Sequence, residues 1–148
     1  MNTKFELLQV CIDHVQKRIE SYKSEIALIK ESIESNDKSS DDEDDSGNSK
    51  LFEDLEKNSQ YLSDAQKTMG IIKSINPNIR YETCVLGSLV KTQENSFFIS
   101  ASIGKIDLDF GSYYAISLQS PIGQLMKNKK AGDHIEFNGK TFSILEIK

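Results

Sequence analysis

The feature that most restricts the fold of this chain is an apolar repeat in its first 33 residues. Apolar side chains recur there in alternating steps of three and four, at Phe5, Leu8, Ile12, Val15, Ile19, Tyr22, Ile26, Ile29 and Ile33. This spacing is typical of a heptad seam along one face of a helix and predicts a coiled coil. Such a helix needs a partner, because packing of its apolar face supplies most of its stability.

A second run with similar spacing can supply that partner. It comprises Leu51, Leu55, Asn58, Leu62, Ala65, Met69 and Ile72. Residues 34–50, between the two runs, contain no apolar residue and predict a solvated loop. We therefore expect residues 1–76 to form an antiparallel coiled-coil hairpin, roughly 40 Å long at ~1.5 Å per residue. A helical bundle and a dimerising coil are the alternatives.

The pattern changes after Pro77, which disfavours helix at the preceding Asn76. Short runs of β-branched and aromatic residues at 84–91, 97–103 and 113–118 predict strands. Residues 80–148 are therefore expected to form a second domain, a small antiparallel β domain. With the helical hairpin before it, the predicted fold class is α+β.

Two local signals refine the prediction for the second domain. Asn138-Gly139 separates two further strand-like runs, which is typical of a tight hairpin with a type I′ turn. Ser120 and Pro121 suit the N-cap and the first position of a short helix. One short helix is therefore expected beside the sheet.

The charge of the chain is concentrated in one place. The formal net charge is −5, and residues 34–50 alone hold seven acidic and two basic residues. An acidic chain is a poor general binder of nucleic acid, because phosphate contacts need Lys and Arg. No apolar stretch is long enough to span a membrane, and Cys11 and Cys84 form no metal or redox motif. We expect a cytoplasmic, monomeric protein.

The sequence offers no convincing active site of its own. The two histidines, His14 and His134, have no partners at ligand spacing. No Gly-rich phosphate loop and no nucleophile elbow is present. We therefore do not expect a self-contained enzyme.

The acidic run Asp41-Asp42-Glu43-Asp44-Asp45 stands at the expected turn of the hairpin. The simplest interpretation of such a run is a solvated linker. Carboxylates at the end of a rigid rod can also be delivered into a cavity, where they would suit a hard cation such as Mg²⁺.

The same segment also partly fits a calcium-binding loop. Asp42, Asp44, Ser46, Gly47 and Glu53 fall at positions 1, 3, 5, 6 and 12 of an EF-hand-like loop. Ser46 departs from the Asp or Asn of that motif. A calcium-responsive coiled-coil adaptor that uses residues 42–53 is therefore an alternative.

The second half of the chain resembles the C-terminal domain of the bacterial Gre transcript-cleavage factors, which are transcription elongation factors. The residues that carry the resemblance are Val85-Leu86-Gly87-Ser88-Leu89-Val90, Tyr114-Ala115-Ile116-Ser117, Ser120-Pro121-Ile122-Gly123 with Leu125, and Ala131-Gly132-Asp133. The order of a coiled coil followed by a β domain similar to FKBP also fits this family. Within it, the loop before the second helix most resembles a compact Gre-like subgroup common in Bacteroidetes.

The resemblance implies a function and a partner. Gre factors bind RNA polymerase through the C-terminal domain and insert the coiled coil into its secondary channel. An acidic pair at the tip helps to hold a Mg²⁺ ion in the polymerase active site, and the polymerase then hydrolyses the 3′ end of backtracked RNA. The factor thus stimulates a nuclease without being one.

The family's acidic pair falls nearest to Asp42 and Asp45, although Asp41, Glu43 and Asp44 are alternatives. The second position is Asp where the family has Glu, and the basic or aromatic neighbours are missing. The resemblance therefore leaves a second outcome open, a channel-binding regulator or inhibitor without cleavage stimulation. For polymerase contact, the residues implied are Ser120, Pro121, Ile122, Gly123, Lys127, Lys129 and Lys130.

Overall fold

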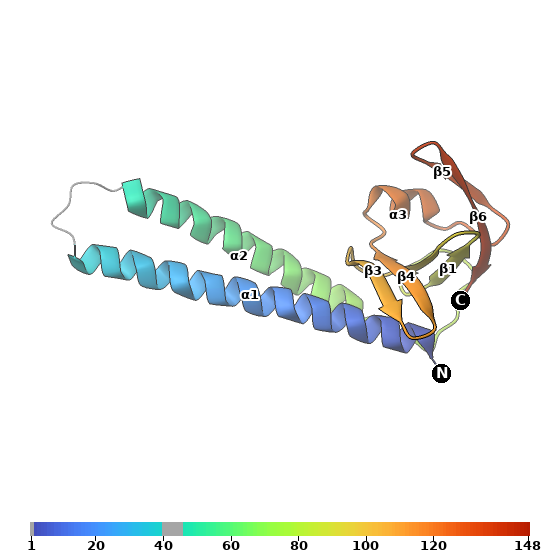
Figure 1. The fold of residues 1–148 in the computed structure, drawn as a ribbon, viewed down its shortest axis with the longest axis horizontal. Coiled ribbons are helices and arrows are strands. Elements are labelled where there is room, and N and C mark those ends of the chain that lie inside the picture. Colours follow the sequence, from blue (N-terminus) through green and yellow to red (C-terminus); the bar gives the residue numbers. More distant parts are fainter. Residues whose placement is uncertain (1, 40–45) are drawn as a thin grey trace. The chain divides into compact units, whose positions relative to one another are not determined.

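The computed structural model describes the backbone of residues 2–39 and 46–148. The elements in chain order are α1 (Thr3–Ser39), α2 (Ser46–Lys73), β1 (Leu89–Thr92), β2 (Ser96–Ile99), β3 (Gly104–Leu108), β4 (Gly111–Ile116), α3 (Pro121–Met126), β5 (His134–Phe137) and β6 (Lys140–Ile147), shown in Figure 1. This α+β architecture confirms the predicted fold class.

The chain divides into two compact units. One unit is Val15–Met69, and the other joins Met1–His14 to Gly70–Lys148. The sheet and α3 belong to the second unit, as do the first turns of α1. The predicted domains, 1–76 and 80–148, stay a prediction of the sequence.

The unit Val15–Met69 is a two-helix hairpin. The rings of Tyr22 and Tyr61 lie 5.6 Å apart between centroids, and Asn36 Nδ2 donates a hydrogen bond of 3.1 Å to Asn48 Oδ1. The residue that is later in α1 contacts the residue that is earlier in α2. The two helices therefore run antiparallel, as predicted. The buried side chains of this unit follow the predicted seam, at Val15, Ile19, Ile29, Ile33, Ala65 and Met69.

Two details of the predicted hairpin are wrong. The predicted loop 34–50 is too long, since α1 continues to Ser39 and α2 already begins at Ser46. A helix extends beyond its apolar seam because its backbone hydrogen bonds do not depend on burial. Phe5 is 56% exposed, whereas Leu7 and Cys11, outside the seam, are fully buried. The first turns of α1 pack within the sheet's unit and therefore bury a different face.

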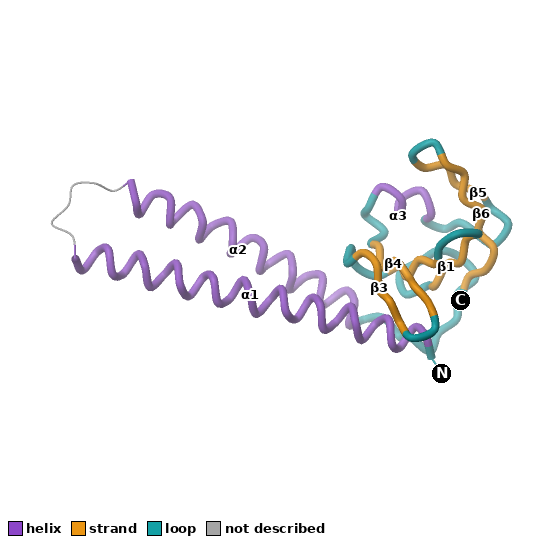
Figure 2. The backbone as a smooth tube through the Cα atoms, viewed as in Figure 1, coloured by secondary structure: helices purple, strands orange, loops and turns teal. Residues whose placement is uncertain are grey.

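The six strands form one sheet in the order β3-β4-β2-β1-β6-β5. Every neighbouring pair is antiparallel except β2 and β4, which pair in parallel from Phe97↔Tyr114 to Ile99↔Ile116. The parallel pair arises because the chain leaves β2, forms β3 at the edge and returns as β4. Figure 2 separates these strands from the helices by colour.

The strand β3 is not predicted by the sequence pattern. Ile106 is the one buried residue of this edge strand, so its alternation is too short to recognise. The predicted strand 84–91 begins only at Leu89, since Ser88 Oγ donates to Val85 O at 2.7 Å and accepts from Val85 N at 3.1 Å. This local turn takes the place of the strand's first half.

The predicted hairpin at the C-terminal end of the sheet is confirmed. Phe137 pairs with Lys140, which leaves Asn138 and Gly139 as a two-residue turn. Their φ angles of 53° and 76° are those that a type I′ turn requires. The core under this sheet comprises Cys84, Val90, Phe97, Ile99, Met126, Ile135, Ile144 and Ile147.

Candidate functional site

The Ser-Pro segment predicted for partner contact begins α3. Ser120 is the N-cap, and its Oγ accepts a hydrogen bond from Gly123 N at 3.1 Å and donates to Ser117 O at 2.7 Å. Pro121 occupies the first turn, where its missing N–H costs nothing. The predicted capped helix is therefore confirmed.

Gly123 has a structural reason to be glycine. The residue is buried, and a Cβ built on it would clash with Ser117 O and lie 2.9 Å from Ser120 Oγ. Ile122 is half-buried against the core, while Pro121 is exposed. Of the predicted contact residues in α3, Pro121 thus offers the most accessible side chain.

Leu125 is a surface residue that is not among the contact residues predicted from the sequence. It lies in α3 and is 42% exposed. Its neighbour Met126 in the same helix is fully buried, so apolar character alone does not separate the two positions. The sequence signal that could have identified Leu125 as a surface residue is the group of lysines directly after it, Lys127, Lys129 and Lys130.

The basic residues Lys127, Lys129 and Lys130 are all exposed. Their turn is held by its backbone, because Asn128 N donates to Cys84 O at 2.9 Å and Cys84 N donates to Lys129 O at 2.9 Å. Lys130 N also donates to Asp133 Oδ2 at 2.8 Å. The three ammonium groups therefore extend from an anchored loop next to Leu125.

Cys84, whose backbone anchors this loop, has a fully buried side chain. Burial, and then the nearby carboxylate of Asp133, raises the pKa of the Cys84 thiol to about 11. A thiol with this pKa is protonated at neutral pH and is a poor nucleophile. Cys84 therefore serves this site as a core residue.

The five tip carboxylates Asp41, Asp42, Glu43, Asp44 and Asp45 lie outside the described residues. The hydrogen bond between Asn36 and Asn48 joins the two helices on either side of that segment. Oxygen donors of this kind suit Mg²⁺, so the residues themselves fit the ion that the resemblance implies.

The backbone of α2 does not favour the calcium-loop alternative. Ser46, Gly47 and Glu53 are all helical, whereas the glycine of such a loop marks a sharp turn. Among residues 2–39 and 46–148, no three His, Cys, Asp or Glu side chains gather as a metal site. No helix in those ranges is long and apolar enough to cross a membrane.

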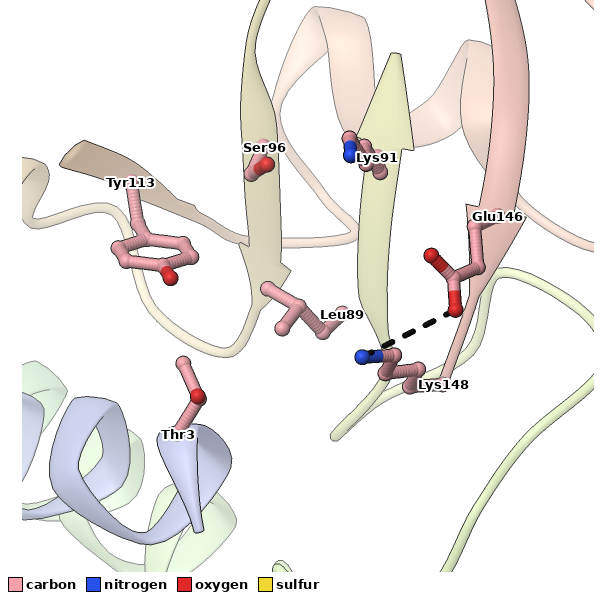
Figure 3. A pocket seen from close by; sticks show the side chains of 7 residues that line it. All are labelled: Thr3, Leu89, Lys91, Ser96, Tyr113, Glu146 and Lys148. Atoms are coloured by element: carbon pink, nitrogen blue, oxygen red, sulfur yellow. Dashed lines mark ion pairs between the residues drawn. The ribbon is translucent and has the colours of Figure 1, made fainter. Parts of the chain in front are cut away.

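A shallow hollow opens over the sheet, as Figure 3 shows. It is lined by Thr3, Leu89, Lys91, Ser96, Tyr113, Glu146 and Lys148. Lys148 Nζ and Glu146 Oε1 form an ion pair of 3.8 Å, and both side chains are about half exposed. The hollow thus has polar groups but no nucleophile paired with a base, and the sequence analysis did not propose it.

No model of a protein family matches the chain, and a comparison with curated proteins found no match. Three solved structures are similar to it over almost their whole length. GreA factor homolog 1 (Gfh1) of Thermus thermophilus is 18% identical with a TM-score of 0.36, covering 93% of this chain and 94% of that one. A structure described as the transcription factor Gfh1 is 17% identical with a TM-score of 0.39, covering 92% of each chain. Thermus aquaticus Gfh1 is 19% identical with a TM-score of 0.35, covering 91% of this chain and 92% of that one.

Proposed function

We propose that this protein is a Gre-like regulator of transcription elongation that binds RNA polymerase. The observation that carries the proposal is the capped Ser-Pro-Ile-Gly helix α3, which presents exposed Pro121 and Leu125 beside three exposed lysines. Residues 120–123 and Leu125 are among those that carry the resemblance to the C-terminal domain of Gre factors. The two-helix hairpin supplies the element that would enter the secondary channel.

The surface at α3 has the composition of a partner contact. An apolar centre at Leu125 lies beside the ammonium groups of Lys127, Lys129 and Lys130. Interfaces commonly combine such an apolar centre with a polar rim, and complementary charge orients the partner. The surface thus fits a polymerase segment that is acidic and carries an exposed apolar residue.

The tip would act through its carboxylates. Asp42 and Asp45 would help to hold Mg²⁺ together with ligands of the polymerase, so the ion belongs to the complex. A second metal ion can activate water for hydrolysis of RNA, and the catalyst is the polymerase. A shorter Asp at the second position also suits an occupant of the channel that regulates without stimulating cleavage.

Binding is tested first, with charge reversal at the α3 surface. Lys129→Glu/Lys130→Glu should weaken association with the cognate RNA polymerase at least tenfold, because it opposes an acidic partner surface. Lys73→Glu/Lys140→Glu changes the charge equally at two exposed lysines of the same unit and should leave binding within about twofold. Equal weakening by both variants would contradict the assignment of this surface.

Cleavage is tested with backtracked elongation complexes and Mg²⁺. We expect the protein to accelerate release of short 3′ RNA fragments and Asp42→Asn/Asp45→Asn to abolish that acceleration. Glu31→Gln/Glu53→Gln removes two exposed helical carboxylates and serves as the matched control. Competition with a known channel-binding factor but no acceleration would identify a channel-occupying regulator. If the protein neither accelerates cleavage nor competes with the channel-binding factor, the polymerase proposal is contradicted.

A further inference from the structure

A second surface of the unit that holds the sheet has the character of a docking groove. It runs between the first turns of α1 and the β3–β4 hairpin and encloses about 430 Å³. Three apolar side chains and three carboxylates carry the argument: Phe5, Leu108, Phe110, Glu6, Asp107 and Asp109. None of them belongs to the α3 surface proposed for polymerase contact.

Two aromatic side chains in the groove keep about half of their surface exposed, although the Phe110 ring also packs edge-to-face on Tyr113 at 6.4 Å between centroids. Phe110 is 46% exposed in the two-residue turn between Leu108 and Gly111, where Asn, Asp and Gly are usual. Phe5 begins the heptad pattern of the sequence, yet it is 56% exposed. Exposed apolar side chains that gather in one concavity mark interaction sites more often than scattered ones do.

The charges of the groove indicate what it binds. Glu6, Asp107 and Asp109 are its charged groups, and no described Lys or Arg lines it. Asp107 accepts a hydrogen bond of 2.5 Å from Ser112 Oγ and lies 4.0 Å from Lys105 Nζ, so it is partly neutralised. An acidic groove repels nucleic acid and anionic lipid, whereas it complements Lys and Arg.

We propose that this groove binds a segment of a partner protein in which an aromatic or aliphatic residue is flanked by Lys or Arg. The apolar residue would insert between Phe5 and Phe110, and the basic residues would pair with Glu6 and Asp109. The proposal goes beyond polymerase binding at α3, because it uses other residues and the opposite charge.

The test uses a random 12-residue peptide phage library, selected on the immobilised full-length protein. Enriched peptides should carry an apolar residue flanked by Lys or Arg. Phe110→Ser/Asp109→Lys should weaken the binding of the synthesised peptides at least tenfold. The matched control Phe52→Ser/Glu53→Lys makes the same chemical change at exposed residues of α2 and should bind them as the natural protein does. Raising the salt concentration should also weaken binding.

Several results would overturn the proposal: no enrichment, enrichment of acidic peptides, or equal binding to the groove variant. The natural protein could also self-associate, lose that association in the groove variant, and bind a peptide of residues 120–130. This result would identify a second copy of the chain as the occupant and would also overturn the proposal. If Phe110→Ser impairs folding, Asp109→Lys alone replaces the double variant. The groove variant should keep its affinity for RNA polymerase, so the two proposals fail separately.

Discussion

Cys11 Sγ lies 3.6 Å from Ser100 Oγ, and both side chains are buried although 89 residues separate them in the chain. Cys11 belongs to the first turns of α1, and Ser100 directly follows β2. Ser100 Oγ also donates to Phe98 O at 3.4 Å. This contact joins the beginning of the chain to the sheet, so it should contribute to the stability of that unit.

Ser100→Ala should lower the free energy of unfolding by about 1 kcal/mol, because the buried thiol loses its polar partner. Ser102→Ala, two residues away and exposed, should change it by less than about 0.5 kcal/mol. Urea denaturation followed by circular dichroism measures both. Equal effects of the two substitutions would show that the Cys11–Ser100 contact is not stabilising.

Gly123→Ala should destabilise the protein by about 3 kcal/mol or more, because the new Cβ meets the backbone oxygen of Ser117, which cannot move freely. Gly70→Ala is the opposite case, since nothing lies within 4 Å of its Cβ and the site is helical. It should stabilise by about 0.5–1 kcal/mol. A mild effect of Gly123→Ala on the melting temperature would mean that the α3 cap tolerates a side chain.

Lys4 is 5% exposed, and its Nζ donates to Ile79 O at 2.6 Å and lies 4.8 Å from the centroid of the Tyr81 ring. Lys4→Met keeps the apolar stem but removes the donor, which should cost about 1–3 kcal/mol of stability. Lys17→Met, at an exposed position of α1, should be nearly neutral. Thermal melting curves that coincide for Lys4→Met and the natural protein would contradict the role assigned to this ammonium group.

The Cys84 thiol should make stability depend on pH in the alkaline range. Its pKa is raised from 9.0 to about 11 by burial and by Asp133, so the folded state holds the proton more tightly than the unfolded state does. The stability from this group is therefore fully present below pH 9.0 and is lost as pH rises toward about 11.

Other groups titrate in this range, so the prediction concerns the difference in stability between the natural protein and Cys84→Ala. Urea denaturation between pH 8 and 11 should show the natural protein losing stability more steeply than this variant. Parallel curves for the two proteins would refute it.

The local parts of the fold were predictable because short-range physics determines them. The heptad spacing from Leu8 to Ile33 gives a helix with one apolar face, and that face needs the second run to cover it. Asn138-Gly139 and Ser120-Pro121 act on backbone angles and hydrogen bonds within a few residues, so their turn and cap were confirmed. The acidic run 41–45 was equally plain in the sequence, but the role of its carboxylates depends on a partner.

Only the tertiary structure decided how the segments combine. Phe5, on the heptad seam, is exposed and Leu7, outside it, is buried, because the first turns of α1 pack with the sheet. This packing is a contact between residues far apart in the chain. The edge strand β3 and the parallel pairing of β2 with β4 likewise depend on where the chain returns. The groove at Phe110 exists only because these distant segments meet. The sequence determined the helices, turns and charges, whereas the exposure of each side chain followed from which distant segment packed against it.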